Sequence, residues 1–189
     1  MEMVNKVVTA AVVAAAVLAA RPGGAQSAAQ SDIMGSCSSI SCDIQKDWLR
    51  NGFLLYGVAD AMPEDKFGFK PTPAQQTFGE RVLHSASTDV SLLVTLGAKT
   101  PPPAIDMKAT AKAGILAALR QSGEYGTAVL KEFSDQQLAE RVASPWFMGP
   151  MSSRQRIVYF LMTHSQDVYG QLAVYLRLNG ITPPLSRQP

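Results

Sequence analysis

The chain has 189 residues, of which 47% are hydrophobic and 17% charged, and its formal net charge is +2. This balance is that of an ordinary globular protein of one domain and excludes an intrinsically disordered chain. Because lysines and arginines are scattered among acidic residues instead of forming a basic stripe, the sequence predicts that the protein does not bind nucleic acid.

The first 25 residues are typical of a signal peptide. Lys6 precedes an uncharged, alanine-rich run over residues 7–20, which is shorter than the roughly 20 apolar residues that a membrane-spanning helix needs. Small residues follow at Gly23, Gly24 and Ala25, so cleavage near Ala25 predicts a periplasmic or secreted protein without stable membrane insertion. An uncleaved anchor is the alternative, whereas a lipid anchor is unsupported because no lipobox cysteine follows the run.

Residues 26–42 are predicted to form a flexible segment ahead of a folded domain over residues 43–189. This segment contains the two cysteines of the sequence, Cys37 and Cys42. In an oxidising compartment such a close pair can form a small disulfide loop, and two free thiols are the alternative. A metal pair is disfavoured, because the spacing is not CxxC and no second pair accompanies it.

Apolar or small residues recur every three or four positions in the first half of the domain, which is typical of amphipathic helices. A first helix is predicted from Ile44 to Met62, where a proline ends it and a loop rich in Gly and Pro follows. A second helix is predicted to begin at Thr72, whose hydroxyl could cap it ahead of Pro73, and to stop around Gly97.

A third helix is predicted along the apolar stripe from Ala111 to Phe133, although three glycines weaken its pattern. A connector with a short helical turn near residues 136–142 follows. The fourth helix is predicted to begin at a capping box in Ser152–Gln155 and to end before Gly180. Since no strand-like alternation of any length occurs and most connections are short or stiffened by proline, the sequence predicts an all-α fold, an antiparallel four-helix bundle.

The two histidines lie on different predicted helices, and the helical phase allows both to point inwards. His164 lies in the middle of the apolar stripe of the fourth helix, so its imidazole needs a partner, and a metal ion is one such partner. His84 lies on a polar row of the second helix, with Glu80, Thr88 and Ser91. Spacing alone therefore favours a plain interpretation, in which this row is solvated and His164 is a hydrogen-bonded core residue.

Two segments resemble the signature regions of the DinB-like family. They read AMPEDKFGFKPTPAQQTFGERVLHSA over residues 61–86 and THSQDVYGQLAVYLRLNGITPP over residues 163–184, and with Trp48 the similarity extends over most of the mature chain. The resemblance implies a four-helix bundle in which one histidine of helix two and an H-x-x-x-H pair of helix four bind a divalent metal ion. His84 and His164 match this pattern, but Val168 stands at the second position of the pair and has no lone pair to donate.

Two histidines would hold a divalent ion such as Zn, Ni, Fe or Mn more weakly than three. Asp167 is an uneasy substitute, because it is displaced by about 100° around the helix from Val168. Glu80 is better placed, one turn before His84 and on the same face. Tyr169 and Gln171 are candidates for groups around the site, or else ordinary packing and hydrogen-bonding residues.

Together with the predicted signal peptide, which indicates export, the resemblance implies a metal-dependent transferase or hydrolase with an incomplete histidine site, whose partner is an unidentified small molecule. The alternative is a non-catalytic ligand-binding or structural bundle that has lost the metal centre, which Val168 and export away from cytoplasmic thiols both favour. A haem-binding bundle has little support, because the sequence has no CxxCH motif. A homodimer is compatible with such a bundle, but the surface pattern does not decide it.

Overall fold

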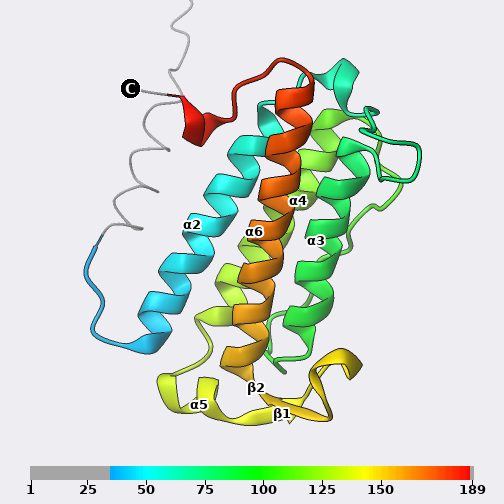
Figure 1. The fold of residues 1–189 in the computed structure, drawn as a ribbon. Helices are drawn as coiled ribbons and strands as arrows, with labels where there is room; N and C mark the ends of the chain where they lie inside the picture. The colour runs from blue at the N-terminus through cyan, green and yellow to red at the C-terminus, as the bar shows by residue number, and fades with distance from the viewer. Residues whose placement is uncertain (1–34, 188–189) are drawn as a thin grey trace, which may run out of the picture.

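The computed structural model describes residues 35–187, and the predicted signal peptide over residues 1–25 lies outside them. The described part of the chain is mostly helical, and none of its helices is long and apolar enough to cross a membrane. Its long helices are α2 (Ile40–Asp60), α3 (Phe78–Val94), α4 (Lys112–Leu130) and α6 (Arg154–Leu178) (Figure 1). The smaller elements are α5 (Asp135–Ala139), the strands β1 (Arg141–Ala143) and β2 (Met151–Ser153), and three 3-10 turns at Glu64–Lys66, Trp146–Met148 and Pro184–Ser186.

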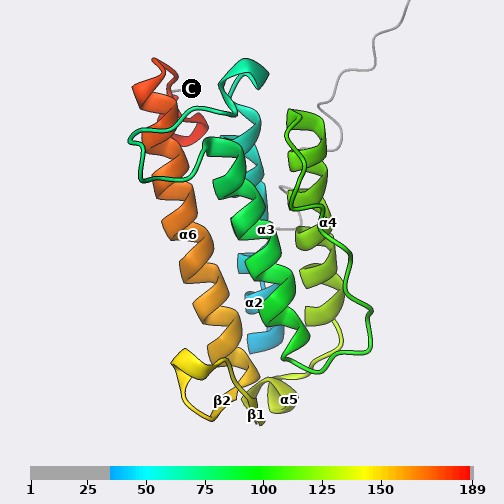
Figure 2. The ribbon, with the colours of Figure 1, turned by 90° about the vertical axis from the view of Figure 1, so that its right-hand side faces the viewer.

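The four long helices pack side by side, each against two neighbours, but they do not alternate in direction (Figures 1 and 2). The carboxylate of Glu132, just after α4, accepts hydrogen bonds from the backbone N–H groups of Lys99 and Thr100, which follow α3. The ends of α3 and α4 therefore meet, and the two helices run in the same direction. The predicted antiparallel arrangement holds for α2 with α4 and for α3 with α6, and is wrong for the other two neighbouring pairs.

The segment between α3 and α4 makes this topology possible. It runs back along the length of the molecule before α4 begins (Figure 2). Its prolines, Pro101 to Pro103, keep it extended and out of any helix. From the sequence, a proline-stiffened connection predicts antiparallel neighbours, whereas in the structure it is the long crossover that parallel neighbours require.

The helix α3 begins after Thr77 and not after Thr72 as predicted. The Thr77 hydroxyl accepts a hydrogen bond from the Glu80 N–H (3.1 Å), and the Glu80 carboxylate accepts one from the Thr77 N–H (2.7 Å). These reciprocal bonds form a capping box. Thr72 lies in a turn of the preceding loop, where the Gln75 N–H donates to its carbonyl. Both segments carry capping residues, and only contacts from the rest of the chain select between them.

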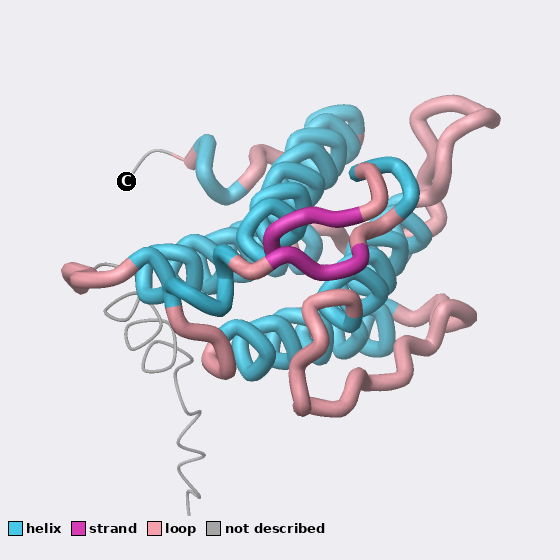
Figure 3. The backbone as a smooth tube through the Cα atoms, turned by 90° about the horizontal axis from the view of Figure 1, so that it is seen from below, coloured by secondary structure: helices cyan, strands magenta, loops and turns pink. Residues whose placement is uncertain are grey.

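The strands β1 and β2 form a small antiparallel pair in the connector between α5 and α6, seen from below in Figure 3. Arg141 lies opposite Ser153, and Ala143 lies opposite Met151. The predicted all-α fold is thus mostly helical but includes this small sheet, which the sequence did not indicate because three-residue strands are too short to show alternation. The predicted helical turn in this connector is confirmed as α5. The helix α6 begins after Ser153, whose side chain accepts from the Arg156 N–H, but without the reciprocal bond of a capping box.

Cys37 and Cys42 form a disulfide, the first of the two alternatives left open by the sequence. Cys42 lies in the first turn of α2, which begins at Ile40 instead of Ile44. The Asp135 carboxylate accepts hydrogen bonds from the backbone N–H groups of Ile40 and Ser41. These bonds satisfy donors that every helix leaves unpaired at its first turn, and they tie the start of α2 to α5.

Candidate functional site

The two histidines face each other across the interface of α3 and α6. Their Nε2 atoms are 3.3 Å apart, and their ring centroids are 5.2 Å apart with the ring planes at 67°. Both side chains are partly buried. The convergence that the helical phase allowed is thus present, and the partner of each imidazole is the other one. The plain interpretation holds for His164 as a histidine hydrogen-bonded to a neighbouring side chain, and that neighbour is His84, which is itself only partly exposed.

The surroundings favour neutral imidazoles. Burial lowers the pKa of His84, and the nearby positive charge of Arg81 lowers it further. Burial also lowers the pKa of His164, and His84 and Arg81 lower it further to a smaller extent. The negative charge of Asp167 raises this pKa. Because both pKa values lie below the ordinary pKa of histidine, the uncharged form of both imidazoles is favoured at neutral pH. A neutral imidazole is the form that binds a metal ion.

The spacing of the two nitrogens fits one shared metal ion. Imidazole nitrogens that lie about 2.0 to 2.1 Å from a tetrahedral zinc ion are about 3.3 to 3.4 Å from each other, which agrees with the separation of 3.3 Å. The same distance also suits a direct hydrogen bond between the two Nε2 atoms, with one imidazole donating to the other. His164 Nδ1 is buried and has no hydrogen-bond partner among the described residues, so the outer support that metal-binding histidines commonly have is missing there.

Among the described residues, no third protein ligand is available at the pair. Val168, one turn after His164, is 0% exposed and packs in the core. The Glu80 carboxylate, the better substitute by spacing, accepts a hydrogen bond from the Thr77 N–H in the capping box and lies outside the site. Within residues 35–187 no group of three or more His, Cys, Asp and Glu side chains could hold a metal ion.

Asp167 lies beside the pair and is held in place by its neighbours. Gln171 Nε2 donates a hydrogen bond to its carboxylate at 2.8 Å, and Arg81 Nη2 lies 3.8 Å from the same oxygen. Gln171 therefore positions the Asp167 carboxylate near the histidine pair. Tyr169 packs against the apolar core, in agreement with the ordinary interpretation of this residue.

Arg81 is a site residue that the sequence reasoning missed. It lies one turn before His84 on α3, and its positive charge acts on both imidazoles. Its Nη1 donates to Gln76 Oε1 at 3.2 Å, whereas its Nε is buried without a partner among the described residues. The spacing of three residues from His84 was the available signal, because residues three apart on a helix share a face.

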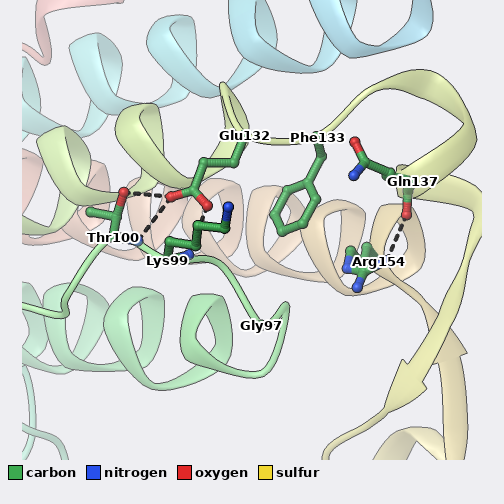
Figure 4. A pocket seen from close by; sticks show the side chains of 7 residues that line it. All are labelled: Gly97, Lys99, Thr100, Glu132, Phe133, Gln137 and Arg154. Carbon is green, nitrogen blue, oxygen red and sulfur yellow. Dashed lines mark hydrogen bonds between the residues drawn. The ribbon is translucent and has the colours of Figure 1, made fainter.

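A separate cavity of about 670 Å³ lies where the ends of α3 and α4 meet the start of α6 (Figure 4). Glu132 on its wall holds the loop after α3 by accepting a hydrogen bond from the Thr100 N–H. Arg154 donates hydrogen bonds to the carbonyls of Leu96 and Gln137. It also forms an ion pair with Glu140. These groups join helix ends to one another, which is a structural role. The cavity is lined by Gly97, Lys99, Thr100, Glu132, Phe133, Gln137 and Arg154, and neither histidine is among them.

Comparisons with known proteins agree with the fold. The chain is similar to a DinB-like protein from Bacillus cereus ATCC 10987, with a TM-score of 0.68 at 18% identity over 77% of this chain and 96% of that chain. It is also similar to a DinB-like protein from Bacillus subtilis, with a TM-score of 0.60 at 17% identity over 77% of this chain and 99% of that chain. No curated protein matches the chain. The model of the DinB superfamily matches residues 50–172, which include both histidines, and the chain therefore belongs to the DinB superfamily.

Proposed function

We propose that this chain is an exported DinB-like protein in which His84 and His164 bind one divalent metal ion, within the site of a metal-dependent transferase or hydrolase. The separation of 3.3 Å between the two Nε2 atoms is the observation that carries the proposal, because it suits two ligands of one ion. The packing of four long helices side by side supports a four-helix bundle of the DinB type. Val168 in place of a third histidine makes the site weak and leaves coordination positions open.

Export is supported by two independent features. The N-terminal sequence has the charge and hydropathy pattern of a signal peptide. The disulfide between Cys37 and Cys42 is typical of proteins that fold in an oxidising compartment.

The residues around the pair suit chemistry on an anionic group. A bound divalent ion would lower the pKa of a coordinated water or thiol, which then acts as the nucleophile. Arg81 places a positive charge beside the histidines, where it stabilises negative charge on a substrate. Asp167, held by Gln171, balances only part of that charge, because its side chain is 62% exposed and lies 3.8 Å from the guanidinium.

Calorimetric titration with zinc, nickel, ferrous and manganous ions tests the proposal. The purified protein should bind about one equivalent of at least one ion with roughly micromolar affinity, and His84→Ala and His164→Ala should each weaken binding by at least about tenfold. Glu80→Gln is the matched control, because this carboxylate caps α3 and should leave metal affinity unchanged. Absence of binding, or binding that survives both histidine substitutions, would contradict the proposal.

Restoring the third histidine gives a sharper version of the same test. In Val168→His the new imidazole should raise zinc affinity by about 100-fold or more, since a third ligand completes the protein's share of a tetrahedral site. Val168 is fully buried, so the metal-free variant should melt at a lower temperature than the parent and recover with zinc. Unchanged zinc affinity would show that position 168 does not face the same point as the two histidines.

A non-catalytic ligand-binding protein is the second candidate function. The observations that favour it are the absence of a third ligand among the described residues and the positive charge of Arg81 beside the pair, which opposes a cation. In that case the two imidazoles form a hydrogen bond, and the titration shows no metal binding with the parent protein.

A further inference from the structure

A row of aromatic rings connects the histidine pair to the surface. The Phe160 ring stacks on the His164 ring, with centroids 6.5 Å apart and planes at 20°. Phe147 packs on Phe160 at 5.0 Å, and Trp146 packs edge-on against Phe147 at 5.7 Å. The row thus extends from α6 to the 3-10 turn between β1 and β2.

Packing within the protein does not explain the outer part of this row. Trp146 is 91% exposed and Phe147 is 46% exposed, so both rings keep most or much of their apolar surface in water. Exposing a ring of this size loses the free energy that its burial would contribute. Exposed, contiguous apolar surface beside convergent polar groups is typical of a ligand-binding surface, and flat rings offer stacking to a flat ligand.

The opposite side of the histidine pair carries a charge. On α6, residues 160, 164, 167 and 171 follow each other at steps of three and four and therefore share one face. Asp167 on this face lies next to Arg81 of α3, whose guanidinium it only partly neutralises at 3.8 Å. Arg81 Nη1 already donates a hydrogen bond to Gln76 Oε1, so Nη2, which lies 3.8 Å from Asp167 and has no hydrogen-bond partner within residues 35–187, is the donor left for a ligand. A carboxylate is the group that accepts the strongest hydrogen bonds from a guanidinium.

We infer that the α3–α6 face binds a flat aromatic carboxylate, with its anionic end at Arg81 and its ring on Phe160 and Phe147. The ligand would lie across His84 and His164, so the inference rests on the proposed function and gives it a substrate class. From residue 160 to residue 167 an α-helix rises about 10 Å, which is about the length of two linked aromatic rings with a carboxylate.

Calorimetric titration with 4-biphenylcarboxylate tests the inference. Arg81→Gln should weaken binding of this probe by about tenfold or more, and Phe147→Ala should weaken it by roughly three- to tenfold. Biphenyl-4-carboxamide, which lacks the charge, and benzoate, which is too short to reach both ends, should each bind more weakly to the parent. Arg50→Gln and Phe53→Ala are the matched controls, since both residues are exposed on α2, and neither should change the affinity.

Fluorescence locates the bound probe independently. The chain has two tryptophans, of which Trp48 is buried in the core and Trp146 belongs to the aromatic row. The probe should quench the emission of the parent, and this quenching should be lost in Trp146→Phe. Equal quenching in both proteins, no binding at all, or equal affinity for the probe and its amide would overturn the inference.

The same titrations on metal-free protein and on His84→Ala separate this inference from the proposed function. If only the metal site is wrong, the probe still binds and still depends on Arg81 and Phe147, while the metal titrations show nothing. If only the ligand class is wrong, zinc binds through both histidines and the probe does not depend on Arg81 or Phe147.

Discussion

Asp89 is a single residue whose burial has a measurable cost. It lies on α3 at 4% exposure, with Ser122 Oγ of α4 3.5 Å from its Oδ2. Its Oδ1 and the nearby buried Ser85 Oγ have no hydrogen-bond partner among the described residues. Burial raises the pKa of Asp89 to about 8, which the weak bond from Ser122 only partly opposes.

Asp89 should therefore make the stability depend on pH. Between about pH 4 and pH 8 the folded protein keeps a proton on this carboxyl that the unfolded chain has released, so the free energy of unfolding falls as the pH rises through this window. Asp89→Asn removes this titration. The free energy of unfolding of Asp89→Asn minus that of the parent, measured with urea, should therefore be larger at pH 8.5 than at pH 4.5 by on the order of a few kcal/mol. Parallel pH profiles of the two proteins would show that the carboxyl is already ionised in the folded state.

The sequence predicted the two histidines but not the whole site. Helical phase was enough to place His84 and His164 on facing sides, because both helices are long and regular. Arg81 shares a face with His84 in the same way, yet spacing alone does not tell an inward arginine from a solvated one. Spacing predicts Glu80 as the better-placed substitute ligand, but its carboxylate caps α3 through the Thr77 N–H. Spacing could not predict this bond, because it depends on where α3 begins.

Among the elements, α2 and α4 depend on one close contact. Trp48 Nε1 donates a hydrogen bond to the Gly123 carbonyl at 3.0 Å, and its ring lies directly against Gly126. A Cβ atom at Gly126 would overlap the Trp48 ring, whereas a Cβ atom at Gly123 meets nothing within 4 Å. Gly123 and Gly126 thus differ in purpose, and of these two only Gly126 is required by packing.

These two glycines form a matched pair for mutation. Gly126→Ala should lower the free energy of unfolding by about 1 to 3 kcal/mol, because the tryptophan must move from a filled interface. Gly123→Ala on the same helix should raise it by roughly 0.5 to 1 kcal/mol, since alanine favours the helix and has space. Urea unfolding measures both values, and equal effects would show that α2 and α4 are not packed as closely as described.

Element boundaries were harder to predict than the elements themselves. The long helices follow from their apolar periodicity, but α3 begins at Phe78, after its cap Thr77, because the N–H groups of Phe78 and Gly79 donate hydrogen bonds to the carbonyls of Phe69 and Phe67. These bonds come from a loop that local sequence does not place. The strands β1 and β2 are set in the same way, by pairing between segments that are each too short to show a pattern.

At the scale of the whole molecule, the direction of the helices decides which side chains meet. The antiparallel contact of α3 and α6 brings Arg81 near Asp167 and His84 near His164. The parallel contact of α3 and α4 instead places Asp89 against Ser122. Connection lengths suggested alternating helices, whereas the crossover between α3 and α4 reverses this for two of the four contacts. Facing residues could therefore be predicted for α3 with α6, but not for α3 with α4.

Anomalous scattering from crystals grown with zinc tests most directly whether the two imidazoles share an ion. A zinc peak should lie about 2.1 Å from the Nε2 atoms of both His84 and His164, with the remaining positions filled by water or a bound anion. A crystal that contains zinc elsewhere but none between these rings, or rings turned away from each other, would show that the two imidazoles do not share an ion.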